Sequence, residues 1–161
     1  MSYGGRTITP SQILKVVQWY YPHFTRFSLL SEPPAGHLMM LDGAYSAIKW
    51  RELRQLRKET KIKKSTMPYV PGKRDCEDFA RLFAQETRQR FTEFPWPHPP
   101  AIGVVMGDMY GVEWHAINFM VVLWKHDWYL YFCEPQAAGI AGVYYPKSKY
   151  SFNDRPKFME M

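Results

Sequence analysis

Arg-Asp-Cys-Glu-Asp-Phe-Ala, at residues 74–80, decides how this chain folds, because two later stretches answer it. They are Trp-His-Ala-Ile-Asn at 114–118 and Phe-Cys-Glu-Pro-Gln at 132–136. The first predicts a helix that opens at a cysteine. The second predicts a strand with a histidine near its start, and the third predicts the end of the next strand at a carboxylate. A thiol nucleophile, its base and the group that orients the base would follow in that order.

The helix that begins at Cys76 places the thiol where an anion is favoured. Asp75 is a suitable N-cap, and Asp78 follows three residues later. The unpaired N–H groups of a first helical turn stabilise a thiolate, whereas the carboxylates of Asp75, Glu77 and Asp78 oppose it. We therefore expect His115 to be the cationic partner that keeps Cys76 ionised.

Glu134 is the candidate for the third role, which is to orient the imidazole of His115. Side chains alternate between the two faces of a strand. His115 and Glu134 therefore share a face only if opposed residues of their antiparallel strands have numbers with an odd sum. A turn over 125–126 or 125–128 gives an odd sum, and a turn over 125–127 gives an even one unless a bulge intervenes. We predict the odd register.

Donors for a developing oxyanion would complete the predicted site. The backbone N–H of Cys76 is one candidate, and the side chains of Tyr69 and Trp50 are candidates for a second donor. Cys133 is expected to lie in the core. Two cysteines do not make a disulfide framework, and the five histidines show no metal-ligand spacing. We therefore expect neither a metal nor another cofactor.

Helices precede strands in the predicted order of elements. Helices are expected at 10–21, 50–59 and 76–90, and a short strand at 37–41. Longer strands, rich in β-branched and aromatic residues, are expected at 101–106, 112–124, 128–133 and 142–145. The proline-rich run at 94–100 is expected to be a stiff loop. This order predicts an α+β fold, in which N-terminal helices that include the nucleophile helix pack on an antiparallel β-sheet.

Length and composition fit one domain over residues 1–161. Hydrophobic residues make up 46% of the chain and aromatic residues 17%, which is ample for one core. No apolar run reaches the roughly 18 residues that span a bilayer, and the start of the chain lacks the apolar stretch of a signal peptide. We therefore expect a cytoplasmic protein with no membrane partner.

The net charge is +6, and much of it is concentrated in residues 49–64. Such a run attracts anions, so an acidic protein or a nucleic acid is a candidate partner. A solvated helix face is the simpler interpretation of the same residues.

The motifs at 75–80, 115–116 and 134 resemble those of the transglutaminase-like branch of the papain-like cysteine peptidase superfamily, and look closest to its bacterial and phage members. The family pattern is an Asp-Cys-Glu-Asp-Phe/Tyr-Ala stretch that opens a helix, a His-Ala pair on a strand and an acidic residue on the next strand. The resemblance covers about residues 66–140, with glutamate where transglutaminases have aspartate. It implies a helical layer against an antiparallel sheet, and thiol chemistry on peptide or amide bonds.

Three functions follow as hypotheses. The leading one is a cysteine-dependent hydrolase or acyl transferase, a thiol peptidase or amidase that acts on a peptide or protein substrate through Cys76, His115 and Glu134. The second is a catalytically inactive member of the same fold that serves as a binding or structural module of a bacterial or phage complex, virion-associated if phage-encoded. The third and weakest is a nucleic-acid-binding domain that uses residues 49–64.

Overall fold

Three helices begin and end close to where the sequence predicts them. The computed structural model describes residues 6–26, 36–62, 67–71, 75–90, 93–137, 139–146 and 154–161. The α-helices in these ranges are α1 (Pro10–Tyr20), α2 (Trp50–Glu59) and α3 (Cys76–Gln89). Helix α1 opens with the predicted capping box, in which the Gln12 backbone N–H donates to the Thr9 hydroxyl and the Gln12 side chain accepts from the Thr9 backbone N–H.

The long strands also lie where they are expected, apart from the last. They are β6 (Ile102–Met109), β7 (Val112–Trp124), β8 (Asp127–Cys133) and β10 (Arg155–Glu160). The short strands are β1 (Thr7–Ile8), β2 (Thr25–Arg26), β3 (His37–Met39), β4 (Tyr45–Ser46), β5 (Ile48–Lys49) and β9 (Val143–Tyr144). A 3-10 turn, η2 (Gly139–Gly142), precedes β9. The sequence pattern did not predict β10, because its six residues include a proline and three charged side chains.

The main sheet is mixed, and this corrects the predicted fold class. Its strand order is β2-β3-β10-β6-β7-β8-β9, with β5 beside β7, and β1 and β4 form a separate pair. Strands β6, β7 and β8 form the expected antiparallel meander. However, β3 pairs with both β10 and β2 in parallel, and β5 pairs with β7 in parallel. The wholly antiparallel sheet predicted for a papain/transglutaminase-like α+β fold is therefore wrong.

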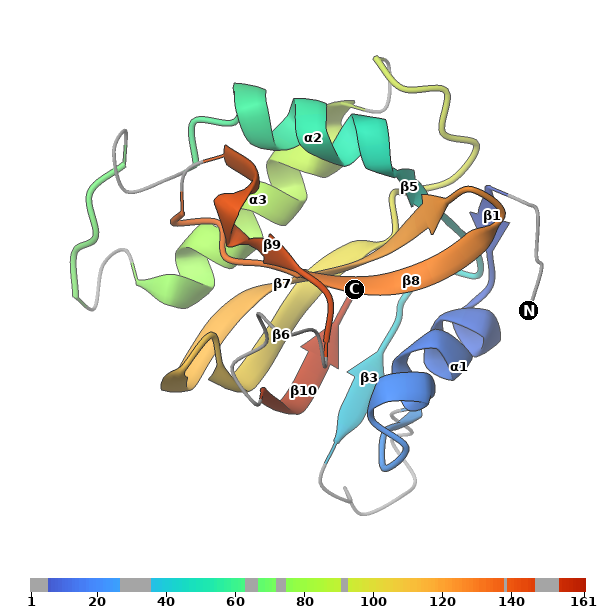
Figure 1. Cartoon of the computed structure of the whole chain (residues 1–161), viewed down its shortest axis with the longest axis horizontal. Helices are drawn as coiled ribbons and strands as arrows, with labels where there is room; N and C mark the ends of the chain where they lie inside the picture. The colour runs from blue at the N-terminus through green and yellow to red at the C-terminus, as the bar shows by residue number, and fades with distance from the viewer. Residues whose placement is uncertain are drawn as a thin grey trace.

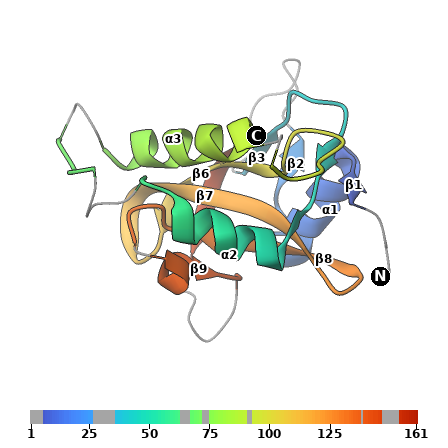
Figure 2. The ribbon, with the colours of Figure 1, turned by 90° about the horizontal axis from the view of Figure 1, so that it is seen from above.

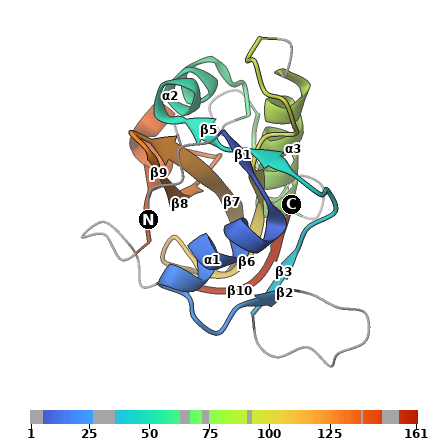
Figure 3. The same cartoon turned by 90° about the vertical axis from the view of Figure 1, so that its right-hand side faces the viewer.

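The helices cover both faces of the sheet rather than forming one layer. The sheet curves around α1 in Figure 3, while α2 and α3 lie together on the opposite face, as Figures 1 and 2 show. Two apolar clusters match this division. Ile13 and Val17 of α1 pack against Phe119 and Phe132, whereas Leu53 of α2 belongs to the cluster on the other face. Within the described ranges, no helix combines the length and apolarity that a membrane crossing requires.

A buried amide joins α3 to the middle of the sheet. Asn118 of β7 has no exposed surface, and its Nδ2 donates to the backbone oxygen of Ala80 at 2.7 Å and to that of Gly103 at 3.1 Å. Asn118 lies on the opposite face of β7 from His115, as the strand alternation predicts. The amide therefore fixes the helix that carries Cys76 relative to the strand that carries His115.

Replacing this amide tests how strongly α3 depends on it. We expect Asn118→Leu to lower the free energy of unfolding by about 1–3 kcal/mol, because the donor to two buried carbonyls is lost. Asn118→Asp has the same shape but sets a carboxylate against those carbonyls, and should cost more, about 3–5 kcal/mol. Urea unfolding of the three proteins measures both values. Equal stability of the Leu and Asp variants would contradict this role.

Candidate functional site

Cys76 is the first residue of α3 and is half-buried. Two of the three acidic residues around it have other partners. The Asp78 carboxylate accepts from the backbone N–H of Asp75 at 3.1 Å, and Glu77 forms an ion pair with Arg81 at 3.5 Å. The thiol therefore sits at the positive end of the helix dipole, with two of the three neighbouring carboxylates turned to other partners.

His115 lies on β7 directly after a distortion of the strand. Gly107 of β6 is opposite His115, but Met109 is opposite Val112, so Asp108 faces two residues of β7 in a bulge. Trp114 has a φ of 49°, which is unusual for any residue other than glycine. The bulge ends at His115 and therefore bends β7 beside the candidate site.

Glycine is required opposite His115. A Cβ added to Gly107 would lie 2.3 Å from the backbone oxygen of Arg155 on β10, too close for any side chain. A second irregularity in pairing falls here, between Pro156 and Phe158. The three central strands thus meet closely at the register position of His115.

Glu134 follows the last residue of β8 and shares a face with His115. Trp124 is opposite Asp127, so the connection is the two-residue turn over 125–126, and every pair from Asn118–Cys133 to Trp124–Asp127 has the same odd sum. The predicted odd register is confirmed. Continued by one step, this register sets Glu134 opposite Ile117, two residues along β7 from His115 and on the same face.

The structure brings the three predicted catalytic side chains together. The Nε2 atom of His115 is hydrogen-bonded to Oε2 of Glu134, and the imidazole also forms a hydrogen bond with the Cys76 thiol. The second carboxylate oxygen, Oε1, accepts from the backbone N–H of Gln136 at 2.9 Å. His115 and Glu134 are 9% and 4% exposed, so this contact is shielded from water. Both oxygens of the carboxylate therefore have a partner.

The electrostatics favour a thiolate beside an imidazolium. The hydrogen bond from His115 lowers the pKa of Cys76, and it outweighs burial, which opposes ionisation; a hydrogen bond from the Ala116 backbone N–H adds to the effect. Burial opposes the charged form of His115, but its hydrogen bonds with Cys76 and Glu134 raise its pKa to about 9. Such an arrangement can attack an electrophile through sulfur and return a proton from the imidazole.

The other thiol of the chain has the opposite character. Cys133 has no exposed surface, and burial raises its pKa to about 12. Its expected place in the core is confirmed. The surroundings of the two cysteines therefore shift their thiol pKa values in opposite directions.

Among the described contacts, the side chains predicted as oxyanion donors form no hydrogen bond with Cys76, His115 or Glu134. Trp50 begins α2, and its ring packs on Tyr131 with the centroids 5.2 Å apart. In the described part of the chain Trp50 makes no hydrogen bond with the triad. Tyr69 is 45% exposed. The oxyanion roles of Trp50, Tyr69 and the Cys76 backbone N–H stay predictions.

Arg57 belongs to the basic run of the sequence at 49–64, but its role in the fold is structural. It is 1% exposed and donates to backbone oxygens of the segment that follows Glu134. The run at 49–64 is therefore not one solvated cationic face. This reduces the support for an acidic or nucleic-acid partner at these residues. Helical spacing carried the signal, because Arg57 stands four residues after Leu53, on its buried face.

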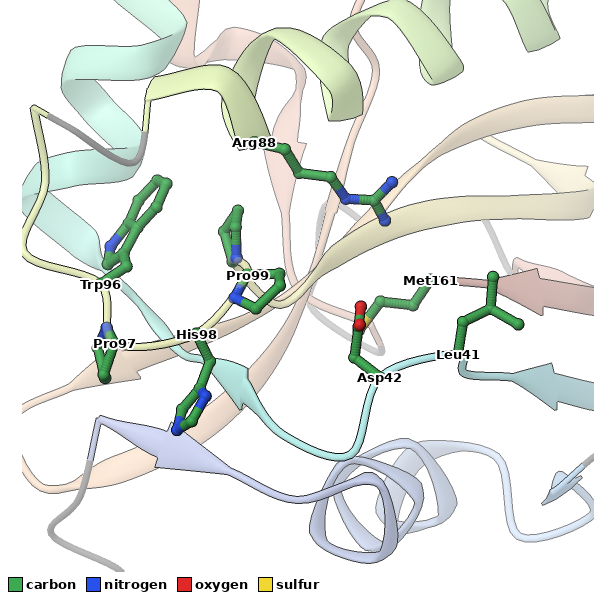
Figure 4. A pocket seen from close by; sticks show the side chains of 9 residues that line it. Leu41, Asp42, Arg88, Trp96, Pro97, His98, Pro99 and Met161 are labelled. Carbon is green, nitrogen blue, oxygen red and sulfur yellow. The ribbon is translucent and has the colours of Figure 1, made fainter.

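A separate hollow lies away from the triad. It has a volume of about 430 Å³ and is lined by residues 97–100 together with Leu41, Asp42, Arg88, Trp96 and Met161 (Figure 4). The Nη2 atom of Arg88 donates a hydrogen bond to the backbone oxygen of Ile102 at 3.1 Å. Within the described residues, no cluster of histidine, cysteine, aspartate and glutamate could hold a metal ion.

Comparison with known proteins finds similarity at the level of structure. No family model matches the sequence, and no curated protein sequence matches it. Two solved structures match with a TM-score of 0.67 and 16% identity: PSL1a in complex with E64, and Polyporus squamosus lectin bound to the human-type influenza-binding epitope Neu5Aca2-6Galb1-4GlcNAc. The matches cover 98% of this chain but only 51% and 50% of those chains. The chain thus has a fold found in about half of the lectin.

These matches correct the resemblance to transglutaminase-like cysteine peptidases. The two matched structures named above are of PSL1a and of Polyporus squamosus lectin, and neither is described as a bacterial or phage peptidase. The functions that followed from the resemblance are corrected with it, both hydrolysis or acyl transfer at peptide bonds and the inactive module of a phage or bacterial complex. The predicted peptide, acidic and nucleic-acid partners are corrected as well, since the second matched structure holds a glycan as its ligand.

The ionisation of Cys76 can be measured directly. In a Cys133→Ala variant we expect the ultraviolet thiolate absorbance to rise with a midpoint below about pH 8.5, the value of an ordinary thiol, because His115 stabilises the anion. His115→Gln should move the midpoint upward. NMR of the wild-type ring should show an imidazolium at neutral pH, consistent with a pKa of about 9. A titration midpoint near that of an ordinary thiol, unchanged by His115→Gln, would contradict the described electrostatics.

Proposed function

We propose that this chain carries a nucleophilic thiol site, in which Cys76 reacts as a thiolate with carbon electrophiles. His115 holds the anion and supplies a proton, and Glu134 fixes the orientation of His115. The single observation that supports the proposal most strongly is the hydrogen-bonded sequence from the thiol through the imidazole to a carboxylate whose second oxygen is also bound.

The roles follow from the positions of the three groups. Because Nε2 of His115 is engaged by Glu134, Nδ1 is the ring nitrogen left for the thiol. With an epoxide, Sγ of Cys76 would form a bond to carbon as the carbon–oxygen bond breaks, and the released oxygen would take the proton of the imidazolium. One of the matched structures is a complex with E64, which makes this compound a suitable probe of the thiol on this fold.

A reactive thiol needs a compartment that keeps it reduced. The cytoplasmic location expected from the sequence provides one. We propose this location, and one domain over residues 1–161, as the setting of the site.

Labelling of the native protein tests the thiol site. We expect iodoacetamide and E64 each to modify Cys76 and leave Cys133 untouched, because only Cys76 is both accessible and ionised. His115→Ala should slow the reaction at neutral pH by about tenfold or more, the effect of at least one pKa unit. Peptide mass spectrometry locates the adduct, and samples quenched at successive times give the rate of Cys76 modification.

Two controls make the result specific. His126→Ala removes an exposed histidine of the turn between β7 and β8 and should leave the rate unchanged. In the unfolded protein both cysteines should react at similar rates. Equal labelling of Cys76 in wild type and His115→Ala would count against the proposal.

Glycan binding is a second candidate function, favoured by the sialylated trisaccharide bound in one of the matched lectin structures. Exposed tryptophans offer flat apolar surfaces of the kind that stack on sugar rings: Trp19 is 73% exposed and Trp114 70%. The site of that trisaccharide lies in a chain about twice as long, so the glycan is assigned to this chain only as a proposal.

Titration with the same trisaccharide tests this second function. We expect a saturable change in tryptophan fluorescence and a matching heat of binding if the shared half of the fold holds the glycan. Galb1-4GlcNAc, which lacks the sialic acid, is the matched control and should bind more weakly. A flat titration with both sugars would remove glycan binding and leave the thiol proposal unaffected.

A further inference from the structure

Arg57 is a cation held inside the protein without a carboxylate partner among its described contacts. It lies in the last turn of α2 and is 1% exposed, while its neighbours Arg54 and Lys58 are exposed. A guanidinium cannot lose its charge in a protein, so its burial is costly unless hydrogen bonds replace water. The contacts that replace water should therefore matter to the molecule.

All of those hydrogen bonds go to one short segment. Nε of Arg57 donates to the backbone oxygen of Gly139 at 3.0 Å, and Nη2 donates to those of Ala137 at 2.6 Å and Glu134 at 3.3 Å. Nη1 lies 3.5 Å from the backbone oxygen of Pro135. The planar fork thus contacts the backbone of residues 134, 135, 137 and 139 and holds it in place.

The guanidinium is itself held in place. Its central carbon lies 5.0 Å from the ring centroid of Phe83, a buried residue of α3. Arg57 therefore connects both helices of one face to the segment 134–139.

The same segment sets the carboxylate of Glu134. Gln136 lies between two residues whose carbonyls Arg57 holds, and its backbone N–H binds Oε1 of Glu134. On the other side, the backbone N–H of Glu134 donates to Gly142 at 2.9 Å. The two backbones also approach closely, because a Cβ at Gly142 would lie 2.7 Å from the Glu134 backbone oxygen. The carboxylate can then offer Oε2 to His115 in one orientation.

We propose that Arg57 is a positioning residue of the thiol site. It holds the 134–139 segment so that Glu134 meets His115, and through His115 it favours the thiolate of Cys76. This inference rests on the proposed function and adds to it a residue that is remote in sequence and makes no described contact with the sulfur.

The test compares Arg57→Met, which keeps the aliphatic volume, with Arg54→Met on the exposed face of the same helix. We expect Arg57→Met to raise the midpoint of Cys76 alkylation, to slow the reaction at neutral pH by about tenfold, and to lower the pKa of His115 seen by NMR. Arg54→Met should match wild type. Arg57→Lys, which keeps the charge but not the fork, should give an intermediate shift if Arg57→Met does not fold.

A double variant separates positioning from general loss of stability. Glu134→Gln should shift the pH profile in the same direction, and adding Arg57→Met or Arg57→Lys to it should shift the profile no further, because both act through one carboxylate. Additive shifts, or an Arg57 variant with the wild-type pH profile despite a lower melting temperature, would overturn the positioning role alone. Ordinary thiol behaviour of wild-type Cys76 would overturn the thiol site and this inference together.

Discussion

The register between β7 and β8 is the constraint on which the candidate site depends. A two-residue turn between Trp124 and Asp127 sets every opposed pair to the same odd sum, and a slip by one residue would send Glu134 to the face away from His115. Both faces of these strands are buried, so such a slip would also exchange the two apolar clusters. The core therefore enforces the geometry that the site needs.

Buried polar groups form a second layer of constraint. Asn118 ties α3 to β7, Arg57 ties α2 to the segment after β8, and Glu134 joins that segment to His115. Each of these groups would be costly to bury without its partners, so the helices and the hairpin have one mutually consistent arrangement. In this way the position of Cys76 is linked to elements far from it in sequence.

The fold of this chain is supported by comparison with solved structures, whereas its chemistry is supported by its own contacts. The fold is that of about half of a lectin chain, shared at 16% identity, a level that does not transfer a ligand or a reaction. The thiol site instead rests on the contacts of this chain's own residues. The shared fold corrects the family resemblance that short motifs suggested, while the geometry around Cys76 stands on separate observations.

Local sequence determined the helices and the antiparallel meander, because capping residues and apolar periodicity act over a few neighbouring residues. The odd register was predicted from the requirement that His115 and Glu134 share a face. The sequence also named Cys76, His115 and Glu134 as a group. Only the tertiary structure decided that β10 inserts between β3 and β6, which makes the sheet mixed, and that Arg57 lies inside the protein. Pairing between strands more than a hundred residues apart leaves no local pattern. Helical spacing places Arg57 on the same face as Leu53, but only the packing shows that this face is covered as far as Arg57.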